Sequence, residues 1–96
     1  MASSNERIHI QVFGRVQNVG FRSHVLSTGS HLGLAGWVRN IGHDQVETVA
    51  EGSRPALEKF LEAVKAGPLG SRVDDARVEW LPATGDFQNF NVRFSR

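Results

Sequence analysis

The sequence predicts an α+β protein with the ferredoxin-like βαββαβ arrangement: an antiparallel-rich sheet, two helices on one face and an extra C-terminal strand. Two observations lead to this fold class. Apolar residues alternate with a period of two in several short segments, and they recur at helical spacing in two segments between them. A tight turn at residues 42–44 also joins two of the alternating segments into an antiparallel hairpin.

The strands are recognised by their alternation. In the first of them, Ile8, Ile10 and Val12 share one face, and the pattern ends at Gly14. The predicted strands are residues 7–13, 34–41, 45–50, 75–82 and a last one in which Phe90, Val92 and Phe94 alternate.

The helices follow from apolar stripes and end signals. The first begins near Phe21 and stops at Gly33, with an inner stripe of Phe21, Val25, Gly29 and Leu32. A glycine inside a helix costs about 1 kcal/mol against alanine, so either Gly29 packs closely on the sheet or this helix is weak. Ser53 caps the second helix, Pro55 lies in its first turn, and its stripe is Leu57, Phe60, Leu61 and Val64.

Length and composition bound the function. The chain of 96 residues forms one domain at residues 7–96, preceded by a flexible segment at residues 1–6. Its 11 basic and 10 acidic residues nearly cancel and the basic ones are scattered, which disfavours a nucleic-acid partner. It has no cysteine, no apolar leader and no stretch of transmembrane length. We therefore expect a cytoplasmic monomer that binds neither nucleic acid nor a membrane.

The most informative stretch is GRVQNVGFR, from Gly14 to Arg22, between the first strand and the first helix. Backbone N–H groups at a helix N-terminus lack helical partners, and the helix dipole there favours an anion. An arginine at the same place opposes the dipole unless a phosphate lies between them, and its planar fork can grip two phosphate oxygens. The spacing fits neither the Walker A nor the Rossmann pattern. A tight turn with a surface arginine explains the stretch equally well on its own.

A second polar residue, Asn40, ends the predicted second strand. In this fold the first and third strands are neighbours and the hairpin brings the second beside the third. The end of the second strand and the loop after Gly14 therefore reach the same edge, where a carboxamide can hold a water through its oxygen. Taken alone, an asparagine before a turn more often caps the turn.

Other candidates are weaker. The four histidines have no metal-binding spacing and are read as solvated side chains: His9, His24, His31 and His43. Ser23 has no nucleophile elbow around it and is read as an ordinary first-turn residue.

Three motifs taken together resemble the acylphosphatase family. They are the stretch from Gly14 to Arg22, then GWVRN from Gly36 to Asn40, then Val46-Glu47 and Ala50-Glu51-Gly52. The resemblance runs from about residue 7 to the C-terminus and implies that Arg22 is the catalytic, phosphate-binding arginine and that Asn40 positions the attacking water. It also implies that the phosphate is cradled by the backbone of the loop Arg15, Val16, Gln17, Asn18, Val19 and Gly20.

The resemblance further implies hydrolysis of a small-molecule acyl phosphate, with no cofactor and no metal. Position 18 departs from the family, which usually has glycine there. Asparagine tolerates a positive φ better than most residues, so the loop is expected to keep its shape. Two alternatives of the same topology stay open: an RNA-binding module, which the absence of aromatics at residues 45–50 disfavours, and a non-catalytic phosphate or carbamoyl-phosphate module.

Overall fold

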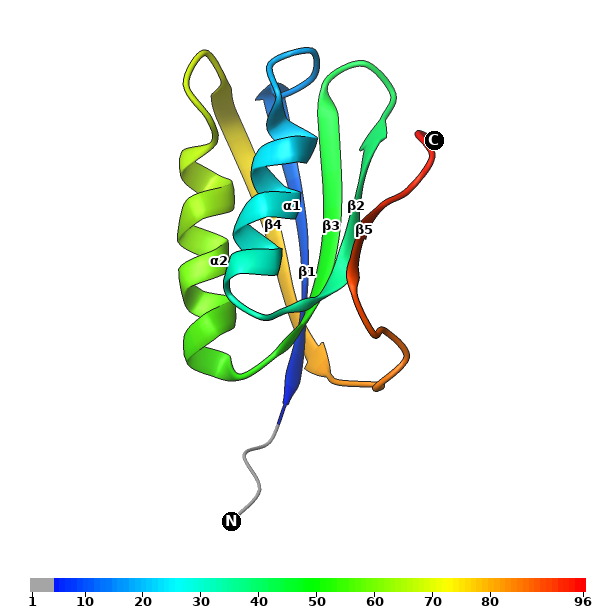
Figure 1. The fold of residues 1–96 in the computed structure, drawn as a ribbon. Helices are drawn as coiled ribbons and strands as arrows, with labels where there is room; N and C mark the ends of the chain where they lie inside the picture. Colours follow the sequence, from blue (N-terminus) through cyan, green and yellow to red (C-terminus); the bar gives the residue numbers. More distant parts are fainter. Residues whose placement is uncertain (1–4) are drawn as a thin grey trace.

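The computed structural model describes residues 5–96 and contains one five-stranded sheet covered on one face by two helices. The elements are β1 (Glu6–Arg15), α1 (Phe21–His31), β2 (Ala35–Ile41), β3 (Gln45–Gly52), α2 (Arg54–Ala66), β4 (Arg72–Pro82) and β5 (Phe90–Val92). The strand order is β4-β1-β3-β2-β5, antiparallel except for the β2–β5 pair. The predicted fold class, including the extra strand, is confirmed (Figure 1).

Several boundaries differ from those predicted. Most of the predicted flexible segment, residues 1–6, lies outside the described residues, but Glu6 is already the first residue of β1, opposite Gly52 and Pro82. β4 begins at Arg72 rather than at residue 75, because a bulge after Phe13 carries β1 on to Arg15, which pairs with Arg72.

The core lies between the sheet and the helices. Ile8, Ile10 and Val12 of β1 point into it and are fully buried. From α2 the buried residues are Leu57, Phe60 and Val64, as their spacing predicted. Ser53 caps this helix by accepting a hydrogen bond from the Ala56 amide at 3.4 Å.

The glycine on the inner stripe of α1 has a packing reason. A Cβ on Gly29 would lie 2.6 Å from the ring of Phe90, so only glycine lets α1 approach β5 this closely. Phe90 in turn packs on Phe60, with ring centroids 5.7 Å apart. The apposition fixes α1, and with it the loop before α1, against the β2–β5 edge of the sheet.

The other face of the sheet carries a polar network instead of helices. Glu51 accepts hydrogen bonds from Arg7, from the backbone and hydroxyl of Thr84 and from the amide of Gly85, at 2.7–3.0 Å. Glu47 bonds to His9 at 2.7 Å and to Arg39 at 2.7 Å. Among residues 5–96, neither helix is long and apolar enough to cross a membrane.

Candidate active site

The loop between β1 and α1 lies at the same end of the sheet as the β2–β3 turn and the C-terminal tail (Figure 1). Gly20, the N-cap of α1, has φ 77°, a left-handed conformation that glycine adopts without strain. Asn18 has φ 59° and is the one non-glycine residue with positive φ among residues 5–96. The loop therefore bends as the sequence predicted, with asparagine adopting the conformation usually taken by glycine.

The bend leaves a run of backbone donors open. Within the described part of the chain, no N–H group of residues 17–23 donates a hydrogen bond; the first helical bond runs from His24 to the carbonyl of Gly20 at 3.0 Å. The amide of Val16 differs, because it already donates to the Gly14 carbonyl at 3.0 Å. Unpaired amides at the positive end of a helix dipole form an anion-binding concavity.

Gln17 holds this bend in place. Its side-chain amide donates to the carbonyls of Ile41, Gly42 and Gln45 at 3.0–3.1 Å, at the end of β2 and the start of β3. The loop is therefore tied through one side chain to the strand that carries Asn40. The sequence placed Gln17 in the loop but gave no signal for this role, which depends on a contact between segments distant in the chain.

Asn40 lies at the end of β2, opposite Val46 of β3, with its side chain on the helix-covered face. The side chain is buried, and its Oδ1 has no hydrogen-bond partner among residues 5–96. A buried acceptor without a partner costs about 1–3 kcal/mol. A bound ligand and its water can supply the hydrogen bonds that this carboxamide oxygen and the neighbouring backbone amides lack.

Arg22, Asn40 and the loop meet around one small pocket of about 90 Å³. Arg22 is exposed and forms no ion pair within residues 5–96, so its guanidinium is available to an anion. The pocket is lined by Val16, Asn18, Gly20, Phe21, Arg22, Ser23 and Asn40.

The remaining predicted loop residues contribute differently. Arg15 ends β1, opposite Arg72, while Gln17 faces the β2–β3 turn, and neither lines the pocket. Val19 is half-buried and packs against the core. Phe21 and Ser23 also line the pocket, a role that was not predicted for them; in the first turn of α1 they carry two of the open amides.

Two histidines correct the sequence-based interpretation. His9 bonds to Glu47, and His24 lies 3.0 Å from the Ala63 carbonyl of α2, so neither is simply solvated. Residues 5–96 contain no cluster of three His, Asp or Glu side chains arranged to hold a metal ion.

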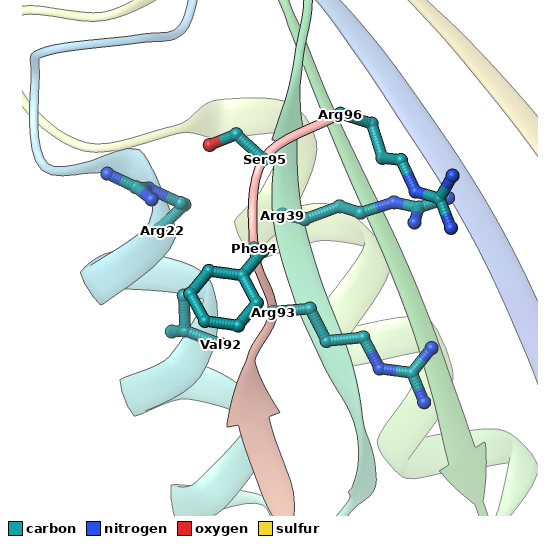
Figure 2. A pocket seen from close by; sticks show the side chains of 7 residues that line it. All are labelled: Arg22, Arg39, Val92, Arg93, Phe94, Ser95 and Arg96. Carbon is teal, nitrogen blue, oxygen red and sulfur yellow. The ribbon is translucent and has the colours of Figure 1, made fainter.

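A larger hollow of about 600 Å³ adjoins the small pocket and shares Arg22 with it. Figure 2 shows Val92 and Phe94 of the C-terminal segment on the side of the sheet that carries α1, while Arg39, Arg93 and Arg96 project toward the other side. The hollow is lined by these residues, Arg22 and Ser95. An anion in the small pocket therefore has an open space beside it.

Together, the fold and the pocket define a small ferredoxin-like protein that can hold an anion between a helix N-terminus, an arginine and a carboxamide. The acylphosphatase family model matches residues 8–92. An acylphosphatase of Anaeromyxobacter dehalogenans is 43% identical over 88 residues, 92% of this chain and 95% of that protein. The chain belongs to the acylphosphatase family.

Solved structures agree. The crystal structure of acylphosphatase from Bacillus subtilis has a TM-score of 0.88 at 40% identity, covering 92% of this chain and 98% of that one. A region of full-length HypF, in its phosphate- and nucleotide-bound form, has a TM-score of 0.89 at 26% identity; the match covers 99% of this chain and 12% of that one.

Proposed function

We propose that this acylphosphatase hydrolyses its acyl phosphate substrate to a carboxylate and inorganic phosphate without a metal ion, using the loop, Arg22 and Asn40. The observation that carries the proposal is the meeting of unpaired loop amides, an unpaired guanidinium and an unpaired buried carboxamide around one pocket of about 90 Å³. Family membership supports the reaction class. The residue roles follow from the chemistry below.

The composition of the pocket limits the leaving group. Its lining contains no carboxyl, histidine, lysine or tyrosine side chain, so no residue there can act as a general acid near neutral pH. An alkoxide leaving group needs such an acid. The carboxylate of an acyl phosphate does not, because its parent acid is strong enough for the anion to depart unprotonated. The pocket thus suits a mixed anhydride better than a phosphate monoester.

The reaction then needs positioning and charge stabilisation. The loop amides and Arg22 gather positive potential around the phosphoryl oxygens, where charge is spread in the transition state. The Asn40 carboxamide orients a water in line with the bond to be broken. The water oxygen bonds to phosphorus, the bond to the acyl oxygen breaks, and the carboxylate leaves with the electron pair. Because Asn40 is a poor base, the proton of the water passes to a phosphate oxygen.

A comparison of leaving groups tests this function. We expect hydrolysis of benzoyl phosphate, no detectable hydrolysis of an alkyl monoester such as glycerol 2-phosphate, whose alkoxide leaving group needs a general acid, and competitive inhibition by inorganic phosphate. Addition of EDTA should leave the rate unchanged. Comparable rates for the two substrates, or loss of activity with EDTA, would contradict the proposal.

A non-catalytic phosphate-binding module remains the second candidate, because the chain is also similar to part of the much longer HypF. The same assay separates the two, since a module of that kind would bind inorganic phosphate in a calorimeter while leaving benzoyl phosphate intact. A monomeric state and a cytoplasmic location stay predictions from the sequence, to be tested by sedimentation and by cell fractionation.

A further inference from the structure

Exposed apolar side chains gather beside Arg22. Among residues 5–96, the large hydrophobic side chains that stay exposed are those of Leu69, Val78, Val92 and Phe94. Two of these, Val92 (45% exposed) and Phe94 (97% exposed), line the hollow of about 600 Å³ that shares Arg22 with the small pocket. Figure 2 shows both on the α1 side of the C-terminal segment. Two apolar side chains together in a hollow next to a reactive site are typical of ligand contact.

The exposure of Phe94 does not come from a loose backbone. The Arg93 amide donates to the Val38 carbonyl and the Arg96 amide to the Asn40 carbonyl, each at 2.9 Å. These bonds attach the segment to β2 on both sides of Phe94. Because successive side chains of an extended segment alternate, they also set the ring on the same side as Val92. The backbone at Phe94 is thus held in place while its ring is exposed to solvent.

Two of the arginines that line the hollow, Arg39 and Arg93, are engaged elsewhere. Arg39 pairs with Glu47 at 2.7 Å, and the Arg93 guanidinium lies 4.6 Å from the centre of the Trp37 ring. Both project to the opposite side of the sheet from Phe94 (Figure 2). The side of the hollow that faces Arg22 is therefore apolar in its large side chains.

We propose that Phe94, supported by Val92, is the contact site for the acyl half of the substrate and favours flat apolar acyl groups. This inference rests on the proposed function. The small pocket holds a phosphoryl group and a water, so the acyl group must lie outside it, and the hollow on the far side of Arg22 is adjacent. An aromatic acyl group laid on the Phe94 ring would shield an otherwise almost fully exposed side chain.

Paired substrates test the proposal. We expect Phe94→Ala to lower kcat/KM for benzoyl phosphate about fivefold, the effect of one lost aromatic contact. The same variant should change kcat/KM for acetyl phosphate less than about twofold, because a methyl group does not reach the ring. Phe94→Trp should restore the preference for benzoyl phosphate. Leu69→Ala is the matched control, since Leu69 is equally exposed in the loop between α2 and β4.

Inhibition by inorganic phosphate serves as the internal reference and should be the same in wild type and Phe94→Ala. Equal losses on both substrates, or no loss on either, would overturn the proposal. So would a wild-type preference for succinyl phosphate over benzoyl phosphate, because a second carboxylate would then be recognised by the arginines. If the wild-type chain hydrolyses none of these substrates, the proposed function itself fails, which is a distinguishable result.

Discussion

The open face of the sheet and the end of the sheet that carries the pocket differ in how their polar groups are hydrogen-bonded. On the open face, Glu51 accepts four hydrogen bonds and Glu47 is bonded to both His9 and Arg39. At the pocket, the amides of residues 17–23, the carboxamide oxygen of Asn40 and the guanidinium of Arg22 are unpaired within residues 5–96.

The difference separates structural from functional polarity. A buried polar group that is fully paired contributes to stability, and its loss exposes partners that remain desolvated. A group left unpaired lowers stability and is retained for what it does with a ligand. Substitutions on the open face should therefore change the free energy of unfolding and spare turnover. Substitutions at the pocket should do the reverse.

The largest effect is expected at Arg22. Arg22→Ala should lower kcat/KM for benzoyl phosphate by about 10²- to 10³-fold, the cost of removing one preorganised charge at a transition state. Arg22→Lys should recover only part of the rate, because an ammonium lacks the planar fork. Thermal unfolding should stay within about 0.5 kcal/mol of wild type, because the side chain is exposed and unpaired.

Lys59→Ala is the control for Arg22→Ala, since it removes an exposed helical cation on α2, away from the pocket. Equal losses of activity in the two variants would mean that general positive charge, and not a placed guanidinium, carries the effect.

The second-largest effect on activity is expected at Asn40. Asn40→Ala should lower kcat about 10²-fold, because the attacking water loses its orienting group. The free energy of unfolding should not fall through any lost side-chain hydrogen bond, since the carboxamide oxygen has none to lose within residues 5–96. Stopped-flow kinetics and urea unfolding measured on the same preparation decide this. A variant that is less active only in proportion to its loss of folded protein would refute the assignment.

The sequence predicted the order of elements, the two neighbours of β3 and the proximity of Arg22 to Asn40, because these depend on local periodicity and on fold topology. Gly20 and Asn18 also signalled the bend by their conformational tolerance. These features are properties of short segments, so a single chain reveals them.

Contacts between distant segments were not predicted. The three carbonyls that bind Gln17, the pairing of His9 with Glu47 and the extension of β4 to Arg72 all depend on the register between strands. Periodicity identifies which face a residue occupies but not which residue lies opposite. The last strand was also predicted to include Phe94, and this was wrong, because β5 ends at Val92 and Phe94 lies beyond it, almost fully exposed.

On the open face, Glu51→Gln should destabilise the protein by about 2 kcal/mol and leave kcat within twofold. Burial alone raises the pKa of Glu51, but hydrogen bonds from Thr84 and Arg7 outweigh it, so the pKa lies below the ordinary value of 4.5. Because the folded-state pKa is depressed, this stabilisation is present above about pH 4.5 and is lost as the pH falls through the folded-state pKa.

Urea unfolding between neutral pH and pH 3 measures this dependence, and the acid slope should be smaller in Glu51→Gln than in wild type. It should not vanish, because Glu47 remains. Burial also raises the pKa of Glu47, and the bonds from His9 and Arg39 likewise outweigh it and depress the pKa. An unchanged slope would show that the Glu51 network does not stabilise the fold.

Gln17 shares features of the paired structural groups and of the pocket residues, since its side chain is hydrogen-bonded and it belongs to the loop of the pocket. Gln17→Ala removes the bonds to Ile41, Gly42 and Gln45 and should affect both readouts. We expect a loss of about 1 kcal/mol in stability. We also expect about tenfold weaker inhibition by inorganic phosphate, because the amides of the bend are no longer held in position. A change in stability with unaltered phosphate inhibition would place Gln17 wholly in the structural class.

The smallest effect is expected at Asn18, where the loop departs from the usual glycine. Asn18→Gly should change kcat less than about twofold, because both residues adopt the φ of 59° found here. Asn18→Val should raise the inhibition constant for inorganic phosphate, since a β-branched residue resists positive φ and would distort the bend. If the glycine variant were instead several-fold impaired, the Asn18 carboxamide itself would have to meet the phosphate. The Asn18 side chain would then be a further phosphate donor of the pocket, beside the backbone amides and Arg22.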